Sequence, residues 1–221
     1  PHVFWLAAIP SSIFGLFLML RDGRLFRAKT LVPILILLLP FAFCAASALC
    51  PPVGWDELVY QLAVPRRWLE AGHATIQPDL PYSAFPCLPQ FLYWPLMGPG
   101  GAVAAKSLSF AIFALLAVSA FLLCRLRCSV KCATVFALAF VLSPIVNGLS
   151  KEAYAEQFIA VNLAAALLLL KGVSPKGGFK DATFAGIFAG AAAAGKLTGA
   201  FAGVAIAGMA LLSKGFSPWQ A

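Results

Sequence analysis

Charged residues are scarce in this chain of 221 residues. Lys, Arg, Asp and Glu make up 11% of it, against about 25% in an average soluble domain, and hydrophobic residues make up 62%, against about 45–50%. This composition excludes a soluble globular protein. The hydrophobic runs reach the length of about 17–25 residues that spans a bilayer as a helix. The sequence therefore predicts an all-α fold, a polytopic transmembrane helix bundle.

Signatures of several other protein classes are also lacking. The chain has no phosphate-binding glycine loop, nucleophile elbow or zinc motif, and no basic region precedes its first hydrophobic run as in a secretory signal peptide. The net charge of +8 comes from short basic clusters between hydrophobic runs, which argues against nucleic acid as a partner. Because the chain begins with Pro1 and ends without a stop-like tail, we expect a processed chain or part of a longer protein.

Five hydrophobic runs are predicted to cross the membrane, at residues 3–20, 30–49, 102–123, 133–149 and 154–170. A sixth run, 182–212, is interrupted around Lys196, and each of its halves is long enough to cross only part of a bilayer. We interpret this run as two short helices that form a tight hairpin, which gives about seven membrane helices. The alternative is one long, tilted helix with a buried lysine.

Basic residues predict the orientation. They follow the first, third and fifth runs and the final hairpin, so that alternating spans place all of them on one side: Arg21, Arg24, Arg27, Lys29, Arg125, Arg127, Lys131, Lys171, Lys176, Lys180 and Lys214. The positive-inside rule makes this side cytoplasmic, and it places residues 50–101 on the outer, periplasmic side of an inner membrane. Six of the eight acidic residues then share the outer face: Asp56, Glu57, Glu70, Asp79, Glu152 and Glu156.

The long outer loop, 50–101, is predicted to be amphipathic and partly helical. Asp56 is expected to cap a helix that ends at Gly72 and that Pro65 kinks or divides. Trp and Tyr side chains along it favour a position in the headgroup layer. The proline- and aromatic-rich stretch that follows resists regular structure until a short helix at about 88–97.

The outer face carries the residues that could do chemistry. A carboxylate there could deprotonate or hold an acceptor hydroxyl, and cations could neutralise a departing phosphate. The acids are Asp56, Glu57, Glu152 and Glu156, and their possible cationic partners are Arg66, Arg67, His73, Lys106, Lys151 and Lys196. Tyr60 and Tyr82 of the aromatic loop are expected to bind substrate and help to exclude water. Each residue also has a purely structural interpretation, such as a helix cap or a lipid-phosphate contact, but their concentration on one face favours function.

Cysteines offer two further possibilities. Cys124, Cys128 and Cys132 have the i, i+4, i+8 spacing of one stripe on a helix, but a metal site usually has a fourth ligand and a different spacing, so packing is the favoured interpretation and no metal site is predicted. Cys50 and Cys87 share the outer loop, where the compartment permits a disulfide, although the spacing does not decide whether they pair.

Several of these segments resemble the C-type (GT-C) membrane glycosyltransferases, in particular the protein-O-mannosyltransferase-like and aminoarabinose-transferase-like enzymes. The segments of the first outer loop are WDELVYQLAVPRRWLEAG, PYSAFPCLPQFLYWPL and AAKSLSF, and the later ones are KEAYAEQFIAVNLAAALLL and AGIFAGAAAAGKLTG. The resemblance runs from about residue 30 to 212. Residues 1–29 would be an additional span with its basic loop, and residues 30–221 a glycosyltransferase-like core that lacks the family's C-terminal part.

The resemblance implies transfer of a sugar from a polyprenyl-phosphate donor at the outer face, with inversion at the anomeric carbon. It makes Asp56 the catalytic base, Glu57 its neighbour and alternate, and Glu156, or else Glu152, the second acid. Lys196 matches the lysine of the break after the sixth helix. No cofactor is implied, although an acid pair is compatible with a divalent cation. The Lys-Pro-Pro of many relatives is absent here, so Arg66 or Arg67 would have to contact the donor phosphate.

Two alternatives remain beside an inverting glycosyltransferase whose partners are the lipid-linked donor and membrane lipids. The first is a non-catalytic accessory or scaffold subunit that packs against other membrane subunits, which the missing Lys-Pro-Pro and the closely spaced glycines permit. The second is a transporter, which would account for the broken last run but is expected to carry more polar residues in mid-span.

Overall fold

The computed structural model describes residues 42–172 and 178–212, and every regular element within these ranges is a helix. The all-α prediction is confirmed there. Two predicted segments lie outside the described residues, the run 3–20 and the basic loop that ends at residue 29. Most of the predicted run 30–49 also lies outside them, and its described part is helical at 42–48.

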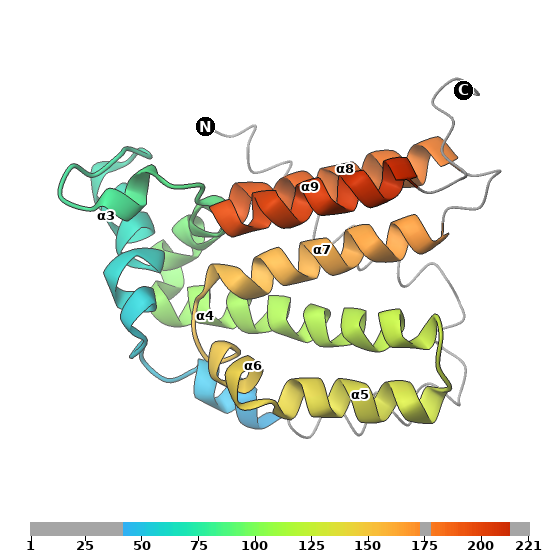
Figure 1. Cartoon of the computed structure of the whole chain (residues 1–221). Helices are drawn as coiled ribbons and strands as arrows, with labels where there is room; N and C mark the ends of the chain where they lie inside the picture. Colours follow the sequence, from blue (N-terminus) through green and yellow to red (C-terminus); the bar gives the residue numbers. More distant parts are fainter. Residues whose placement is uncertain (1–41, 173–177, 213–221) are drawn as a thin grey trace.

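The outer loop folds as short helices at one end of the bundle (Figure 1). A π-helical turn, η1 (Glu57–Gln61), leads into α3 (Ala63–Ala71), and a 3₁₀ turn, η2 (Pro81–Ala84), follows. Pro65 cannot donate a backbone hydrogen bond, and it lies in the first turn of α3, where none is required. The predicted division of the helix near Pro65 is therefore confirmed. The predicted stop at Gly72 is also confirmed, because Gly72 adopts a left-handed φ of 74°.

α4 (Leu88–Arg125) is the longest described helix. It includes both the short helix predicted at about 88–97 and the span predicted at 102–123. It is broken at Gly101, whose φ of 60° and ψ of −159° are accessible essentially only to glycine. Pro95 and Pro99 lie in the segment before this break. Among the described helices, α4 is the one long and apolar enough to cross a membrane, while shorter apolar helices occur in α5, α7 and α9.

The predicted single span 133–149 is wrong. The chain instead forms α5 (Val130–Leu142) and the short α6 (Pro144–Leu149), which meet at Ser143. Proline disfavours helical dihedrals in the residue before it, and Ser143 accordingly has an extended ψ of 131°. Pro144 is well placed as the first residue of the new helix. α6 therefore lies near the outer-loop end of the bundle and does not continue α5 (Figure 1).

The last apolar block forms the predicted hairpin of two helices, α8 (Gly178–Gly195) and α9 (Leu197–Leu212), and the long tilted helix is excluded. Gly199 explains how closely they pack, because a Cβ atom there would lie 2.0 Å from the carbonyl oxygen of Ala192. Gly186, by contrast, has open space around it. Close packing in this hairpin thus depends on the glycines of α9.

α7 (Ala155–Gly172) lies in the centre of the bundle and packs against α4, α8 and α9 (Figure 1). One buried cluster joins α4 to α7: Leu92, Ile112, Leu116, Phe158, Val161 and Ala164. A second joins α7 to the hairpin, mainly through small side chains: Ala165, Ala166, Ala185, Phe188 and Ile206. Because alanines dominate this second contact, the helices approach closely without a large apolar core.

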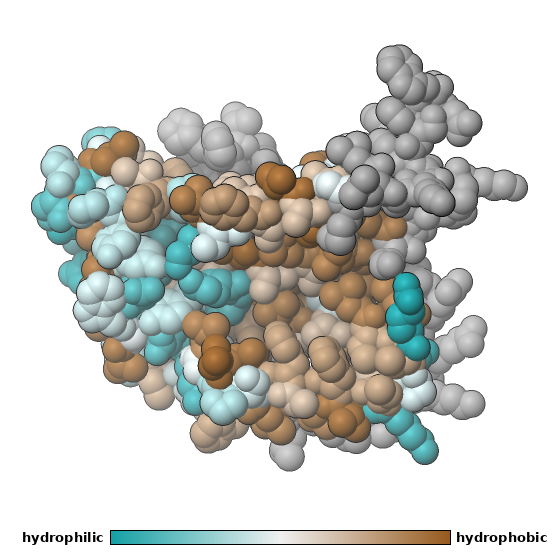
Figure 2. All heavy atoms as spheres, in the orientation of Figure 1, coloured by the Kyte–Doolittle hydropathy of each residue, from teal (hydrophilic) through white to brown (hydrophobic). Residues whose placement is uncertain are grey.

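Hydrophilic side chains gather at the end of the bundle that carries α3, and hydrophobic side chains cover the flank of the helices (Figure 2). Exposed large apolar side chains occur on α5, α8 and α9: Val135, Phe136, Leu142, Ile187, Leu197, Phe201 and Val204. Exposed apolar surface of this kind marks contact with lipid or with another protein. We call the end that carries η1, α3, α6 and the α8–α9 connection the polar end.

The close contact of the hairpin predicts how two glycines respond to the same substitution. Gly199→Ala is expected to lower the free energy of unfolding by about 1–3 kcal/mol, because the new methyl group overlaps the α8 backbone. Gly186→Ala, with open space, should leave it unchanged or raise it by up to about 1 kcal/mol. Thermal unfolding of both variants in the same detergent tests this, and equal midpoints would contradict the contact.

Candidate functional site

The two adjacent acids of the outer loop have different environments. Glu57 is fully buried, and within the described residues its side chain accepts hydrogen bonds from three backbone amides. Oε2 accepts from the N–H groups of Val53 (3.2 Å) and Gly54 (3.4 Å), and Oε1 accepts from the N–H of Ala153 (2.8 Å). Since Ala153 lies 96 positions along the chain, Glu57 joins the start of the outer loop to the connection between α6 and α7.

Glu152 lies against the same turn. A Cβ atom on Gly54 would lie 2.3 Å from its Oε2 and 2.6 Å from its Cδ, so the carboxylate rests directly on the glycine. Ser109 of α4 fixes the backbone here by donating to the carbonyl oxygen of Glu152 at 2.9 Å. Position 54 therefore accepts no side chain while Glu152 stays in place.

Asp56 is half-buried, and its carboxylate faces a tyrosine. The hydroxyl of Tyr60 donates to Oδ2 of Asp56 at 3.1 Å, and the ring of Tyr60 stacks on that of Tyr82 with centroids 4.7 Å apart. Burial raises the pKa of the Tyr60 phenol, which keeps this proton on the tyrosine. The expected cap is wrong in detail, since Asp56 occupies the N-cap position but its side chain makes no capping hydrogen bond.

Glu156 and Lys196 form an ion pair at the same end of the bundle. Lys196 Nζ lies 2.6 Å from Glu156 Oε1, and both side chains are about one-third exposed, at 33% and 39%. Glu156 lies in the first turn of α7, and Lys196 connects α8 to α9. Burial lowers the pKa of Lys196, but the Glu156 carboxylate, with a smaller contribution from Tyr60, outweighs this and raises it overall.

Tyr60 connects the ion pair to Asp56. The positive charge of Lys196 opposes the rise in the pKa of Tyr60, and the Asp56 carboxylate adds to it, so both groups act on the same phenol. We call Asp56, Tyr60, Glu156 and Lys196 the polar cluster. These residues come from the outer loop, α7 and the hairpin connection, and the fold brings them together at the polar end.

Tyr154 extends this environment towards Glu152. Burial raises the pKa of its phenol, and the carboxylates of Glu152 and Asp56 raise it further. Two carboxylates therefore act on one phenol that stays protonated at neutral pH.

Arg66 and Arg67 are not part of the polar cluster. Arg66 pairs with Glu70 at 3.2 Å on the exposed surface of α3, and Arg67 holds both oxygens of Asp79 at 2.6 and 2.7 Å. The guanidinium of Arg67 lowers the pKa of Asp79, which keeps that carboxylate charged. The two arginines thus tie α3 to itself and to the loop that follows.

Sequence reasoning missed two buried polar residues next to the site, Gln61 and Gln90, and it gave Lys106 only as a possible partner of the acids, not as a buried residue. Lys106 of α4 is 2% exposed, and its ammonium donates to the carbonyl oxygens of Cys50 (2.8 Å) and Pro51 (3.2 Å). Gln90 donates to Gln61 at 2.7 Å, and the other amide atom of Gln90, Oε1, has no hydrogen-bond partner within the described chain. The available signal was an isolated polar residue in an apolar segment, which is costly unless it is bonded.

The described part of the polar end contains no group of three side chains placed to hold a metal ion; in the described residues such a group occurs only at Cys124, Cys128 and Cys132, at the opposite end. Cys50 and Cys87 are free thiols, so the disulfide considered from the sequence is not formed. No protein-family model, curated protein or solved structure matches this chain. The functional argument therefore depends on the residues themselves.

The burial of Glu57 generates a direct prediction. Glu57→Gln replaces a carboxylate oxygen with an NH₂ group that cannot accept from a backbone amide, so the free energy of unfolding should fall by about 1.5–3 kcal/mol. Glu70→Gln, at an exposed ion pair of α3, should change it very little. Denaturant or thermal unfolding of the two variants measures both effects. Equal stabilities would show that Glu57 does not carry this contact.

Proposed function

We propose that this chain is a multi-pass membrane protein of about seven helices that transfers a glycosyl group from a polyprenyl-phosphate-linked sugar to a lipid, glycan or protein acceptor. The observation that carries the proposal is the polar cluster, a half-buried carboxylate beside a protonated tyrosine and a lysine–carboxylate pair at the polar end of an apolar bundle. The motif resemblance to C-type membrane glycosyltransferases supports the same assignment.

In this proposal Asp56 is the general base. Its carboxylate accepts the proton of the acceptor hydroxyl as the hydroxyl oxygen attacks the anomeric carbon, and the bond from that carbon to the phosphate oxygen breaks with inversion. Tyr60 donates a hydrogen bond to Asp56 and orients its carboxylate, and the ring of Tyr82 stacks on the ring of Tyr60. Glu57 holds the turn that presents Asp56 through its hydrogen bonds to backbone amides.

Lys196 is the cation assigned to the departing phosphate. Its pairing with Glu156 keeps the ammonium charged and in place beside the cluster, where a second anion can share it. Arg66 and Arg67, which the sequence offered for this role, are engaged by Glu70 and Asp79. Glu152 stays next to the turn at Gly54, where it supports the site.

The proposed location is the cytoplasmic (inner) membrane, with the polar end outside. Support comes from the length and apolarity of α4 and from the charge distribution. The acids of the outer loop and of the connection to α7 lie at the polar end, while Arg125, Arg127 and Lys131 lie where α4 meets α5 at the other end. The positive-inside rule assigns this second end to the cytoplasm.

A second candidate is an accessory subunit of a larger membrane assembly. Both arginines are engaged in surface ion pairs, so Lys196 is the cation of the polar cluster. Lys196 is itself paired with the Glu156 carboxylate, and this shortage of cations for a phosphate favours a non-catalytic subunit. The exposed apolar side chains of α5, α8 and α9 would then contact other subunits.

Asp56→Asn separates the two candidates. In membranes that contain the full chain and a radiolabelled polyprenyl-phosphate sugar, the wild type is expected to move label to an acceptor, and Asp56→Asn should reduce the rate by about 10²–10⁴-fold because the base is lost. Asp79→Asn, a carboxylate of the same loop outside the polar cluster, is the matched control and should retain activity. Transfer unaffected by Asp56→Asn would contradict the assigned base, and no transfer by an inserted, folded wild type would favour the accessory subunit.

A further inference from the structure

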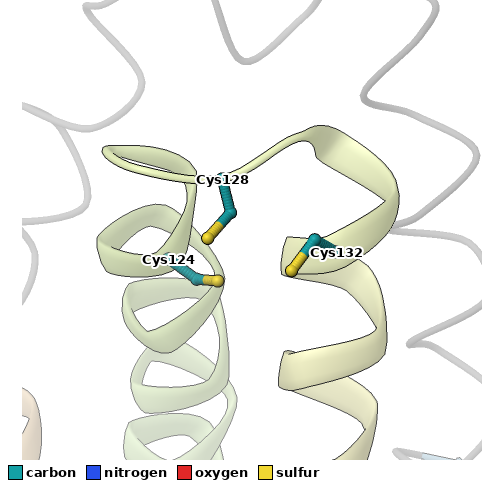
Figure 3. Close-up of side chains that lie close together, drawn as sticks. All are labelled: Cys124, Cys128 and Cys132. Carbon is teal, nitrogen blue, oxygen red and sulfur yellow. The ribbon is translucent and has the colours of Figure 1, made fainter.

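Three cysteine thiols converge at the end of the bundle opposite the polar cluster (Figure 3). Cys124 lies in the last turn of α4, Cys128 in the connection, and Cys132 in the first turn of α5. Their sulfur atoms all lie within 4.8 Å of one another. The expected single helical stripe is wrong, because α4 ends at Arg125 and the chain turns back, so that the thiols face one another from two helices and the turn between them.

The turn that carries these thiols is held by several hydrogen bonds. The backbone N–H of Cys128 donates to the carbonyl oxygen of Cys124 at 2.9 Å, and the guanidinium of Arg125 donates to the carbonyl oxygen of Cys128. Ser129 caps α5 by accepting from the N–H of Cys132. Below the turn, Phe121 packs with Ala133 and Ala137 and fixes the distance between the helices. The contacts between α4, the turn and α5 therefore fix the positions of the three cysteines relative to one another.

The spacing and the chemistry both suit a thiophilic ion. Metal–thiolate bonds of about 2.3 Å place the sulfurs of a three-thiolate site about 4 Å apart, so small side-chain rotations close this triad around one ion. All three thiols are free. Three thiolates and a divalent ion carry a net charge of −1, and the cations Arg125, Arg127 and Lys131 adjoin them in the chain.

We propose that Cys124, Cys128 and Cys132 bind one soft divalent metal ion of the zinc and cadmium class through three thiolates, with the fourth position left for water or an external ligand. Sulfur ligands select such ions over Mg²⁺ and Ca²⁺, which require oxygen. A disulfide would use only two of the three thiols, whereas an ion accounts for the convergence of all three. The site is independent of the polar cluster, and binding there releases thiol protons, so affinity rises with pH.

Cadmium is the probe. Cd²⁺ is added to the full chain, purified in detergent with a phosphine reductant, and thiolate-to-metal charge-transfer absorption is recorded beside the bound metal per chain. The expected result is one ion per chain and a higher unfolding temperature in its presence. Cys128→Ser and, separately, Cys132→Ser should weaken binding by at least about 10-fold, since they remove direct ligands. Cys50→Ser, at an exposed cysteine of the outer loop, is the matched control and should bind as the wild type does.

Three results would overturn the proposal. These are the absence of charge-transfer absorption with the reduced wild type, equal affinity in Cys128→Ser and the wild type, or equal loss in Cys50→Ser. Circular dichroism of each variant without metal separates loss of a ligand from loss of the fold. If Cys128→Ser fails to fold, Cys132→Ser provides the same comparison, because Cys132 is exposed and has little packing to lose.

Discussion

The hydrogen bonds of the Glu57 carboxylate hold together the end of the molecule at which the polar cluster forms. A buried carboxylate is stable only when its oxygens are fully bonded, and here backbone amides from two distant segments provide the donors. Because one oxygen binds Ala153 and the other binds Val53 and Gly54, the outer loop cannot move away from the start of α7 without breaking the hydrogen bonds of a buried carboxylate. The positions of Asp56 and Glu156 relative to each other follow from this link.

A second link fixes the outer loop to α4. The ammonium of Lys106, buried in that helix, binds the carbonyl oxygens of Cys50 and Pro51, and Ser109 one turn later binds the carbonyl oxygen of Glu152. The outer loop and the connection between α6 and α7 are thus attached to α4 as well as to each other. Three side chains of the polar cluster, those of Asp56, Glu156 and Lys196, remain partly exposed, while Tyr60 is buried.

Much of the helical plan could be predicted from local signals. Gly72 predicted the end of α3, and the interruption around Lys196 predicted the division between α8 and α9. The division at Ser143 was not predicted because the run 133–149 is mostly apolar and long enough to span, and a single proline can also be accommodated within or at the start of a helix. Periodicity also misplaced the three cysteines, because regular spacing does not reveal that α4 ends between the first and the second.

The distinction between Asp56 and Glu57 could not be predicted. Adjacent residues on a helical turn point about 100° apart, so the two side chains meet different surroundings, but which of them faces inward depends on an amide 96 positions away. The same holds for the arginines, whose partners Glu70 and Asp79 compete with any phosphate. Local patterns identified a segment rich in polar residues, and tertiary contacts determine the environment of each residue within it.

Hydrogen exchange at the amide of Ala153 tests most directly whether Glu57 joins the two loops. In the full chain in detergent, this amide is expected to be protected, and Glu57→Gln should speed its exchange together with that of Val53 and Gly54, while amides in the middle of α7 keep their rates. Unchanged exchange at Ala153 in Glu57→Gln would show that the two loops are held together by other contacts, and the account of the polar end would be wrong.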